Sequence, residues 1–188
     1  MKIFYIPDGH RRYADQKLCS LAESYRVGYR ALVEELIEPV LALDYVSRLD
    51  VFLLSNLNLR RRDRDDLEML LRHGERMLWE LVDHCRPLAS IATYGTYLTR
   101  NISYAGRADK QLNLVLGCTT DDDIGLSEVD LFIRTGGEIR LSGAPRTIIG
   151  NYTQFYGIPE LHPNLRFEHI VGCLSHYRTR YMREAQTA

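Results

Sequence analysis

Short apolar runs alternate along this chain with longer amphipathic stretches, and this alternation restricts the fold more than any other feature. The runs are continuous and short, which is typical of strands that are covered on both faces of a parallel sheet. They span residues 2–7, 49–54, 88–95, 112–119 and 129–135. Strands that alternate with helices predict an α/β protein with a mostly parallel central sheet flanked by helices. In such sheets the ligand crevice lies beyond the carboxyl ends of the strands.

Three longer stretches have the three- and four-residue apolar spacing of amphipathic helices. The first begins at a capping box on Ser20 and is expected to reach about residue 43 despite an internal proline. The second follows the charged segment 60–66, and the third spans roughly residues 166–183. No repeat, low-complexity stretch or linker interrupts this pattern, so residues 1–188 are expected to form a single domain.

Charge and composition exclude several classes of function. The chain has 24 Lys and Arg against 25 Asp and Glu, so no global field attracts nucleic acid or an anionic membrane. No apolar run reaches the roughly 18 residues of a membrane span, and no signal peptide precedes the first charges. The four cysteines stand far apart, which argues against zinc and disulfides. We therefore expect a cytoplasmic protein without a transmembrane segment.

The loop after the first strand carries the first candidate site. It contains a carboxylate, a glycine and two consecutive arginines, in the order Asp8, Gly9, His10, Arg11, Arg12. A carboxylate can hold a divalent cation, and a glycine lets backbone amides approach phosphate oxygens. Guanidinium groups grip phosphate bidentately, and the chain has 21 arginines against 3 lysines. The loop predicts a site for a metal and a diphosphate, with an ordinary turn containing an Asp-Arg ion pair as the alternative.

A second candidate site follows the strand over residues 129–135. This strand ends in Arg-Thr-Gly-Gly, so Arg134, Arg140 and Ser142 can converge on a second phosphate group. The glycine pair alone is not diagnostic, because a tight turn out of a strand would also select it.

A third polar segment follows the strand over residues 49–54. Ser55 and Asn58 come first, and three arginines stand behind them at 60–62. Taken alone, this segment is typical of a solvated helix entry, because neighbouring aspartates cancel most of its charge. The Asp121–Asp123 run is likewise more typical of a solvated turn than of a metal site.

In this order, the three segments resemble the cis-prenyltransferase family. The stretch Ile133 to Glu138 matches the family's isoleucine-arginine-threonine-glycine-glycine-glutamate block residue for residue. Asp8 to Ala14 resembles the family's first loop, and Ser55 to Arg61 resembles its serine, asparagine and arginine stretch. The start of the chain is most similar to the irregular branch of the family, which includes cyclolavandulyl diphosphate synthase. The resemblance covers nearly the whole chain.

This resemblance implies a fold, an activity and a set of site residues. The first set would bind an allylic diphosphate, with Mg²⁺ held by Asp8. The other residues of this set are Gly9, His10, Arg11, Arg12, Ser55 and Arg61. A second set would anchor the acceptor diphosphate, and it consists of Arg134, Arg140, Ser142 and the partner's Arg178 or Arg180 in a homodimer. Asn58 and Tyr25 would join Asp8 and His10 in the reaction. The candidate bases for the final proton loss are His10, Tyr25 and the released diphosphate.

Departures from the family pattern bear on the reaction. An arginine and a histidine that hold the allylic diphosphate in chain-elongating members fall at Leu21 and Tyr25, and a metal-binding glutamate falls at Thr153. The lost arginine and histidine, and a chain too short for a long lipid tunnel, favour irregular, head-to-middle coupling of dimethylallyl diphosphate units over cis chain elongation with isopentenyl diphosphate. The lost glutamate leaves Asp8 as the expected carboxylate ligand of the metal. A cyclase or transferase acting on one longer prenyl diphosphate is a further alternative. The last alternative is a non-catalytic subunit of a prenyltransferase. Such subunits lose the aspartate of the first loop, whereas this chain retains it as Asp8.

Overall fold

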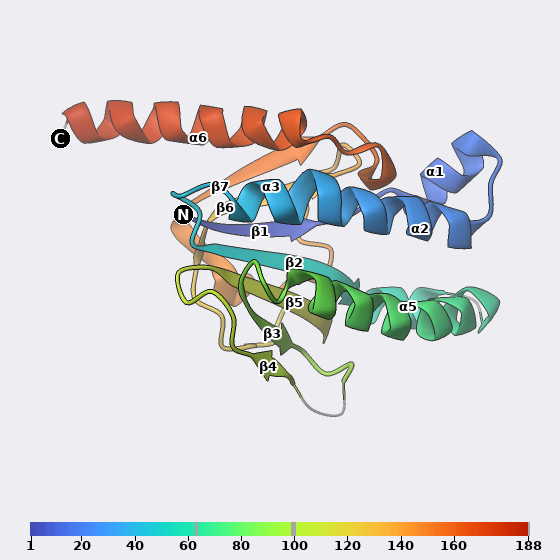
Figure 1. The fold of residues 1–188 in the computed structure, drawn as a ribbon. Coiled ribbons are helices and arrows are strands. Elements are labelled where there is room, and N and C mark those ends of the chain that lie inside the picture. The colour runs from blue at the N-terminus through green and yellow to red at the C-terminus, as the bar shows by residue number, and fades with distance from the viewer. Residues whose placement is uncertain (63, 99–100, 188) are drawn as a thin grey trace.

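A seven-stranded sheet forms the centre of the computed structural model, which describes residues 1–62, 64–98 and 101–187 (Figure 1). The strand order is β4-β3-β5-β2-β1-β6-β7, and every neighbouring pair is parallel except β3 with β4. The strands are β1 (Lys2–Ile6), β2 (Arg48–Ser55), β3 (Ser90–Tyr94), β4 (Ser103–Tyr104), β5 (Gln111–Cys118), β6 (Val129–Thr135) and β7 (Ile149–Ile158). The expected mostly parallel α/β fold is confirmed.

The α2–α3 segment, α5 and α6 lie on one face of this sheet, with α6 and the α2–α3 segment beside each other and α5 further along, and α1 lies beyond the carboxyl ends of the strands (Figure 1). They are α1 (His10–Lys17), α2 (Leu21–Leu32), α3 (Glu38–Leu41), α4 (Asn56–Arg61), α5 (Arg64–Cys85) and α6 (Phe167–Thr187). Two short 3-10 turns, at Arg146–Ile148 and His162–Asn164, complete the described elements. None of the described helices is long and apolar enough to cross a membrane.

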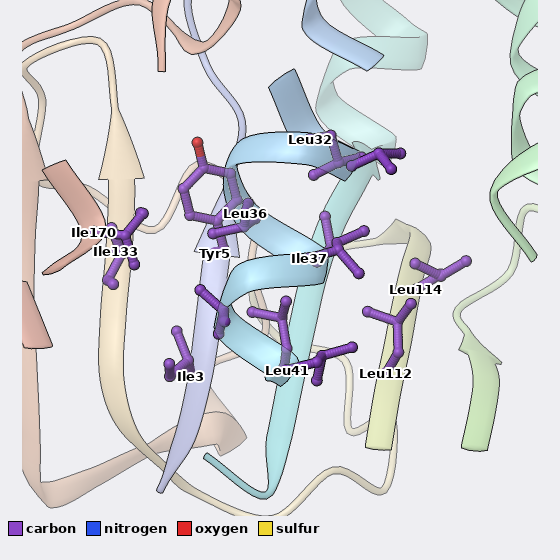
Figure 2. Close-up of a cluster of buried hydrophobic side chains, with 14 of the residues drawn as sticks. Ile3, Tyr5, Leu32, Leu36, Ile37, Leu41, Leu112, Leu114, Ile133 and Ile170 are labelled. Carbon is purple, nitrogen blue, oxygen red and sulfur yellow. The ribbon is translucent and has the colours of Figure 1, made fainter. Parts of the chain in front are cut away.

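Alternation along β1 divides the core into two layers. Ile3 and Tyr5 point to the helical face, where they pack with Leu36, Leu112 and other side chains that Figure 2 shows. Phe4 and Ile6 point to the opposite face and pack with Leu126, Ala144 and Ile148, which lie in the segments before and after β6. Because successive strand residues face opposite sides, a strand buried on both faces is mainly apolar, and the buried polar pair Asp50 and Asn113 is joined by a hydrogen bond.

The first long helix begins and ends close to its expected limits. Ser20 caps it by accepting a hydrogen bond from the Glu23 amide at 3.1 Å. The helix continues to Leu41 through a π-helical turn at Val33–Ile37, just before Pro39. Proline has no amide hydrogen to donate, and a wider turn lets the chain continue past it.

Candidate active site

The loop after β1 is tied to the end of β6. The Asp8 amide donates to Thr135 Oγ1 at 2.8 Å, and the Gly9 amide donates to the carboxylate of Asp8 at 2.6 Å. Gly9 has φ of +109°, and a Cβ there would lie 2.8 Å from Leu161 Cδ2. Both the backbone conformation and the close approach therefore require glycine. The result is a carboxylate held at the start of α1.

Arg134 joins the two polar segments that the sequence places far apart. Its side chain is 3% exposed, and Nη2 lies 2.5 Å from Asp8 Oδ2. Nη1 donates to Ser142 Oγ at 2.5 Å and to the carbonyl of Arg140 at 3.0 Å. Glu138 Oε2 lies 3.5 Å from Nη2 and 2.7 Å from Nε of Arg140, whose side chain is largely exposed. The two expected phosphate sites therefore adjoin each other at a buried guanidinium group.

The two arginines at the start of α1 have different partners. Nη1 of Arg12 donates to the carbonyl of Gly136 at 2.9 Å, and its Nη2 lies 3.7 Å from Asp8 Oδ2. Arg11 pairs instead with Asp66 of α5 at 2.8 Å. Both line the same cavity, so α1 presents positive charge beside the Asp8 carboxylate.

A cavity of about 940 Å³ opens at this point, between α2, α5 and the carboxyl ends of β1, β2 and β5. Its polar end is lined by Asp8, Gly9, His10, Arg11, Arg12 and Arg62. Its walls are mainly apolar and aromatic, and include Tyr25, Tyr29, Leu32, Leu53, Leu54, Met77, Leu78, Leu81, Tyr97 and Leu116. A cationic end joined to apolar walls suits an amphiphilic anion with a hydrocarbon tail.

His10 and Tyr25 stack against each other in this cavity. Their ring centroids are 4.5 Å apart, and Nδ1 of His10 donates to the carbonyl of Ser24 at 3.3 Å. A Cβ on Gly28 would lie 2.2 Å from His10 Cε1, so the missing side chain makes room for the imidazole. Burial lowers the pKa of His10 to about 4, so its ring is neutral at neutral pH.

His162 links α2 to β1 and to the Asp8 loop through hydrogen bonds. Its Nε2 donates to the carbonyl of Gly28 at 2.9 Å, and its Nδ1 accepts a hydrogen bond from the hydroxyl of Tyr5 at 2.8 Å. Its backbone amide donates to the carbonyl of Asp8 at 2.8 Å. Burial lowers the pKa of His162 well below its ordinary value. His162 was not predicted as a site residue, because a single histidine in the sequence carries no signal of its contacts.

The two buried histidines predict a loss of stability in mild acid. Below pH 6.5 the unfolded chain binds protons at both rings that the folded chain does not, so the free energy of unfolding falls toward pH 4. Burial raises the pKa of Asp50 to about 6, and this group opposes the trend by at most one proton. The net loss is about 1.4 kcal/mol per pH unit. Urea unfolding at pH 7.5, 6.0 and 5.0 measures it, and a constant free energy of unfolding would contradict it.

The remaining residues of the third segment are only partly described. Ser55 is buried at the end of β2. Asn58 and Arg61 belong to α4, and the side chains of these two residues lie outside the described part of the structure. Thr153, at the family's glutamate position, is buried in β7, where its hydroxyl donates to the carbonyl of Val129 at 2.6 Å. It therefore serves the packing of β7 against β6.

Arg178 and Arg180 do not join this site within one chain. The guanidinium of Arg178 lies 4.3 Å from the ring centroid of Tyr45, whose carbonyl accepts a hydrogen bond from the amino terminus of Met1. Nη1 of Arg180 donates to Gln154 of β7 at 3.3 Å. Helix α6 runs back along the sheet from the carboxyl ends of the strands toward their amino ends (Figure 1). The described contacts of Arg178 and Arg180 are therefore with Tyr45 and Gln154, not with the residues of this site.

The candidate metal ligand of this site is the carboxylate of Asp8. Among the described residues, no group of three His, Cys, Asp or Glu side chains could hold a metal ion. Asp122 and Asp123 accept hydrogen bonds from the amides of Thr119 and Gly125, as expected for a turn. Asp8 keeps free lone pairs beside its bonds to Gly9 and Arg134. A single carboxylate fits Mg²⁺ that arrives on a diphosphate, since Mg²⁺ commonly takes one or two carboxylates and phosphate oxygens.

Comparison with solved structures places the chain in the cis-prenyltransferase-like fold. The crystal structure of lavandulyl diphosphate synthase from Lavandula x intermedia, in complex with dimethylallyl diphosphate, superposes with a TM-score of 0.78. The match covers 94% of each chain at 18% sequence identity. No family model matches the sequence, and no curated protein does. The chain therefore shares the fold of lavandulyl diphosphate synthase, as the resemblance of its three motifs implies.

Proposed function

We propose that this chain is a prenyltransferase that couples short isoprenoid diphosphates, with two dimethylallyl diphosphate units joined head to middle. The cavity carries this proposal, because its cationic end and apolar walls match a diphosphate and a hydrocarbon tail in one continuous space. The fold of lavandulyl diphosphate synthase, a protein solved with dimethylallyl diphosphate, supports it.

The allylic diphosphate would leave from the polar end of the cavity. Negative charge grows on the diphosphate as the carbon–oxygen bond breaks, so fixed donors such as Arg12 stabilise the transition state more than the bound substrate. Asp8 would hold Mg²⁺, which supplies further positive charge to the departing group. The apolar walls, including Leu53 and Tyr29, would keep water away from the cationic carbon.

The acceptor diphosphate would bind beside it, against Arg134, Arg140 and Ser142. Because Arg134 contacts both Ser142 and Asp8, the two diphosphates would lie next to each other and their tails would enter one cavity. This arrangement brings the acceptor double bond to the allylic cation without a diffusional search. Nε2 of His10, the hydroxyl of Tyr25 and the released diphosphate remain the candidates for accepting the final proton.

The exposed face of β7 and α6 supports a homodimer. β7 is an edge strand, and Tyr152 is 74% exposed, Phe155 39% and Val171 38%. Exposed aromatic side chains on an edge strand are typical of an interface. In the proposed dimer, Arg178 and Arg180 approach the acceptor site of the partner. A cytoplasmic location is also proposed, and the four free cysteines suit a reducing compartment.

Product analysis tests the reaction. Dimethylallyl diphosphate as the sole substrate with Mg²⁺ is expected to give a branched C10 diphosphate, identified by mass spectrometry and NMR after dephosphorylation. A product formed only when isopentenyl diphosphate is added would show cis chain elongation instead. Turnover of neither mixture, nor of longer substrates, would indicate a non-catalytic subunit.

The size of the cavity favours one second candidate. Ligand pockets commonly measure about 300–1,000 Å³, and about 940 Å³ lies near the top of that range. A longer prenyl tail therefore fits as well as two short ones. Conversion of a C15 or C20 diphosphate alone, without dimethylallyl diphosphate, would identify a transferase or cyclase of such a substrate.

A further inference from the structure

Arg62, directly after α4, lines the polar end of the cavity together with Asp8 and His10. Its Nη1 is buried and has no hydrogen-bond partner among the described residues. A buried guanidinium nitrogen without an acceptor is unfavourable, because it has lost water and gained no replacement. Such an atom beside a cavity indicates an acceptor that arrives with a ligand.

The guanidinium of Arg62 stands over an aromatic stack. Its central carbon lies 5.7 Å from the ring centroid of Tyr25, and that ring stacks in turn on His10. Cation–π contacts of this kind orient an arginine without using its hydrogen-bond donors. Arg62 is therefore positioned by the stack while Nη1 remains available.

The carboxylates that line the cavity are already paired with other arginines. Asp8 contacts Arg134, Glu23 accepts two hydrogen bonds from Arg26, and Glu80 accepts one from Arg76 at 2.7 Å. None of these contacts involves Arg62. The described lining therefore offers no unpaired carboxylate to Arg62, and guanidinium groups match the oxygens of phosphate.

We infer that Arg62 binds the leaving diphosphate, a role that the family's motif spacing gives to Arg61. The inference rests on the proposed function and adds a residue to its site. Arg62 would act on the same diphosphate as Arg12, because both line the polar end of the cavity. Arg62 therefore contributes both to substrate binding and to stabilisation of the departing group.

The test compares Arg62→Gln and Arg62→Lys with a control in the same arginine run. Arg60 lies on α4 and is exposed, so Arg60→Gln removes an equal charge outside the cavity. Isothermal titration measures binding of inorganic pyrophosphate with Mg²⁺, and steady-state assays separate kcat from KM. We expect Arg62→Gln to weaken pyrophosphate binding about 10- to 100-fold, Arg62→Lys to recover part of it, and Arg60→Gln to change it less than about twofold.

Each outcome decides between the two proposals. If wild type binds pyrophosphate and turns over prenyl diphosphates while both Arg62 variants match it, the inference is wrong and the proposed function stands. If wild type shows neither binding nor turnover, both are wrong. Should Arg62→Gln fail to fold by circular dichroism, Arg62→Lys carries the comparison, because lysine keeps the charge and loses the bidentate fork.

Discussion

Asp8→Asn is expected to lower kcat/KM for the prenyl diphosphate substrate about 100- to 1,000-fold, and Asp8→Ala to abolish measurable turnover. Asparagine preserves the size of the side chain and can still accept the hydrogen bond from the Gly9 amide. It has no negative charge to hold Mg²⁺ on the diphosphate or to balance Arg134, whose Nη2 lies 2.5 Å away. The loss should therefore fall mainly on kcat, since charge on the diphosphate grows in the transition state.

A matched control separates this effect from a general change in charge. Asp15 lies exposed on α1, so Asp15→Asn removes the same charge from the same helix away from the cavity. Its kcat/KM should remain within about twofold of wild type. A Mg²⁺ titration of Asp8→Asn should require more metal for half-maximal rate. Wild-type activity of Asp8→Asn at the same Mg²⁺ concentration would remove Asp8 from the reaction.

Arg134→Gln is expected to cost both activity and stability. The guanidinium is buried and has four partners, so its loss removes the nearest cation from Asp8 and a hydrogen-bond donor from Ser142. Because Asp8 is 34% exposed and can recover some hydration, we expect a loss of about 2–3 kcal/mol in the free energy of unfolding. For a chain of 188 residues this lowers Tm by roughly 5–10 °C. Differential scanning calorimetry measures the shift.

Arg140→Ala provides the contrast for Arg134. Its side chain is 67% exposed and pairs with Glu138 on the surface, so its loss should leave Tm nearly unchanged. We still expect kcat/KM to fall about 10- to 100-fold, because one charge-assisted bond to the acceptor diphosphate is removed. If Arg134→Gln and Arg140→Ala changed Tm and kcat/KM equally, Arg134 would not link the allylic and acceptor diphosphate sites.

The sequence predicts most of the fold because the buried strands are mainly apolar. The run at 112–119 became β5 almost to the residue, and its one fully buried polar side chain, Asn113, donates a hydrogen bond to Asp50 of β2. β7 was not predicted. It is an edge strand with polar residues such as Asn151 and Gln154, and its pattern is not distinct from that of a loop. The short β4, with two residues, was missed for the same lack of signal.

The motifs identify the main site residues, and the contacts between them depend on strand order. β1 lies between β2 and β6, and this order brings Asp8 to Arg134 across 126 positions of sequence. Spacing within either motif carries no information about that contact. Arg62 shows a second limit, because neighbouring residues at a helix end point in directions about 100° apart. Motif alignment therefore cannot decide which of two adjacent arginines enters the cavity.

A crystal structure with Mg²⁺ and a non-hydrolysable thiolo analogue of dimethylallyl diphosphate tests the central claim most directly. We predict that the diphosphate lies at the polar end of the cavity, within hydrogen-bond distance of Arg12 and Arg62, with Mg²⁺ between it and Asp8. The hydrocarbon tail should enter between α2 and α5. An analogue bound elsewhere on the protein, with these guanidinium groups turned toward bulk solvent, would contradict the account.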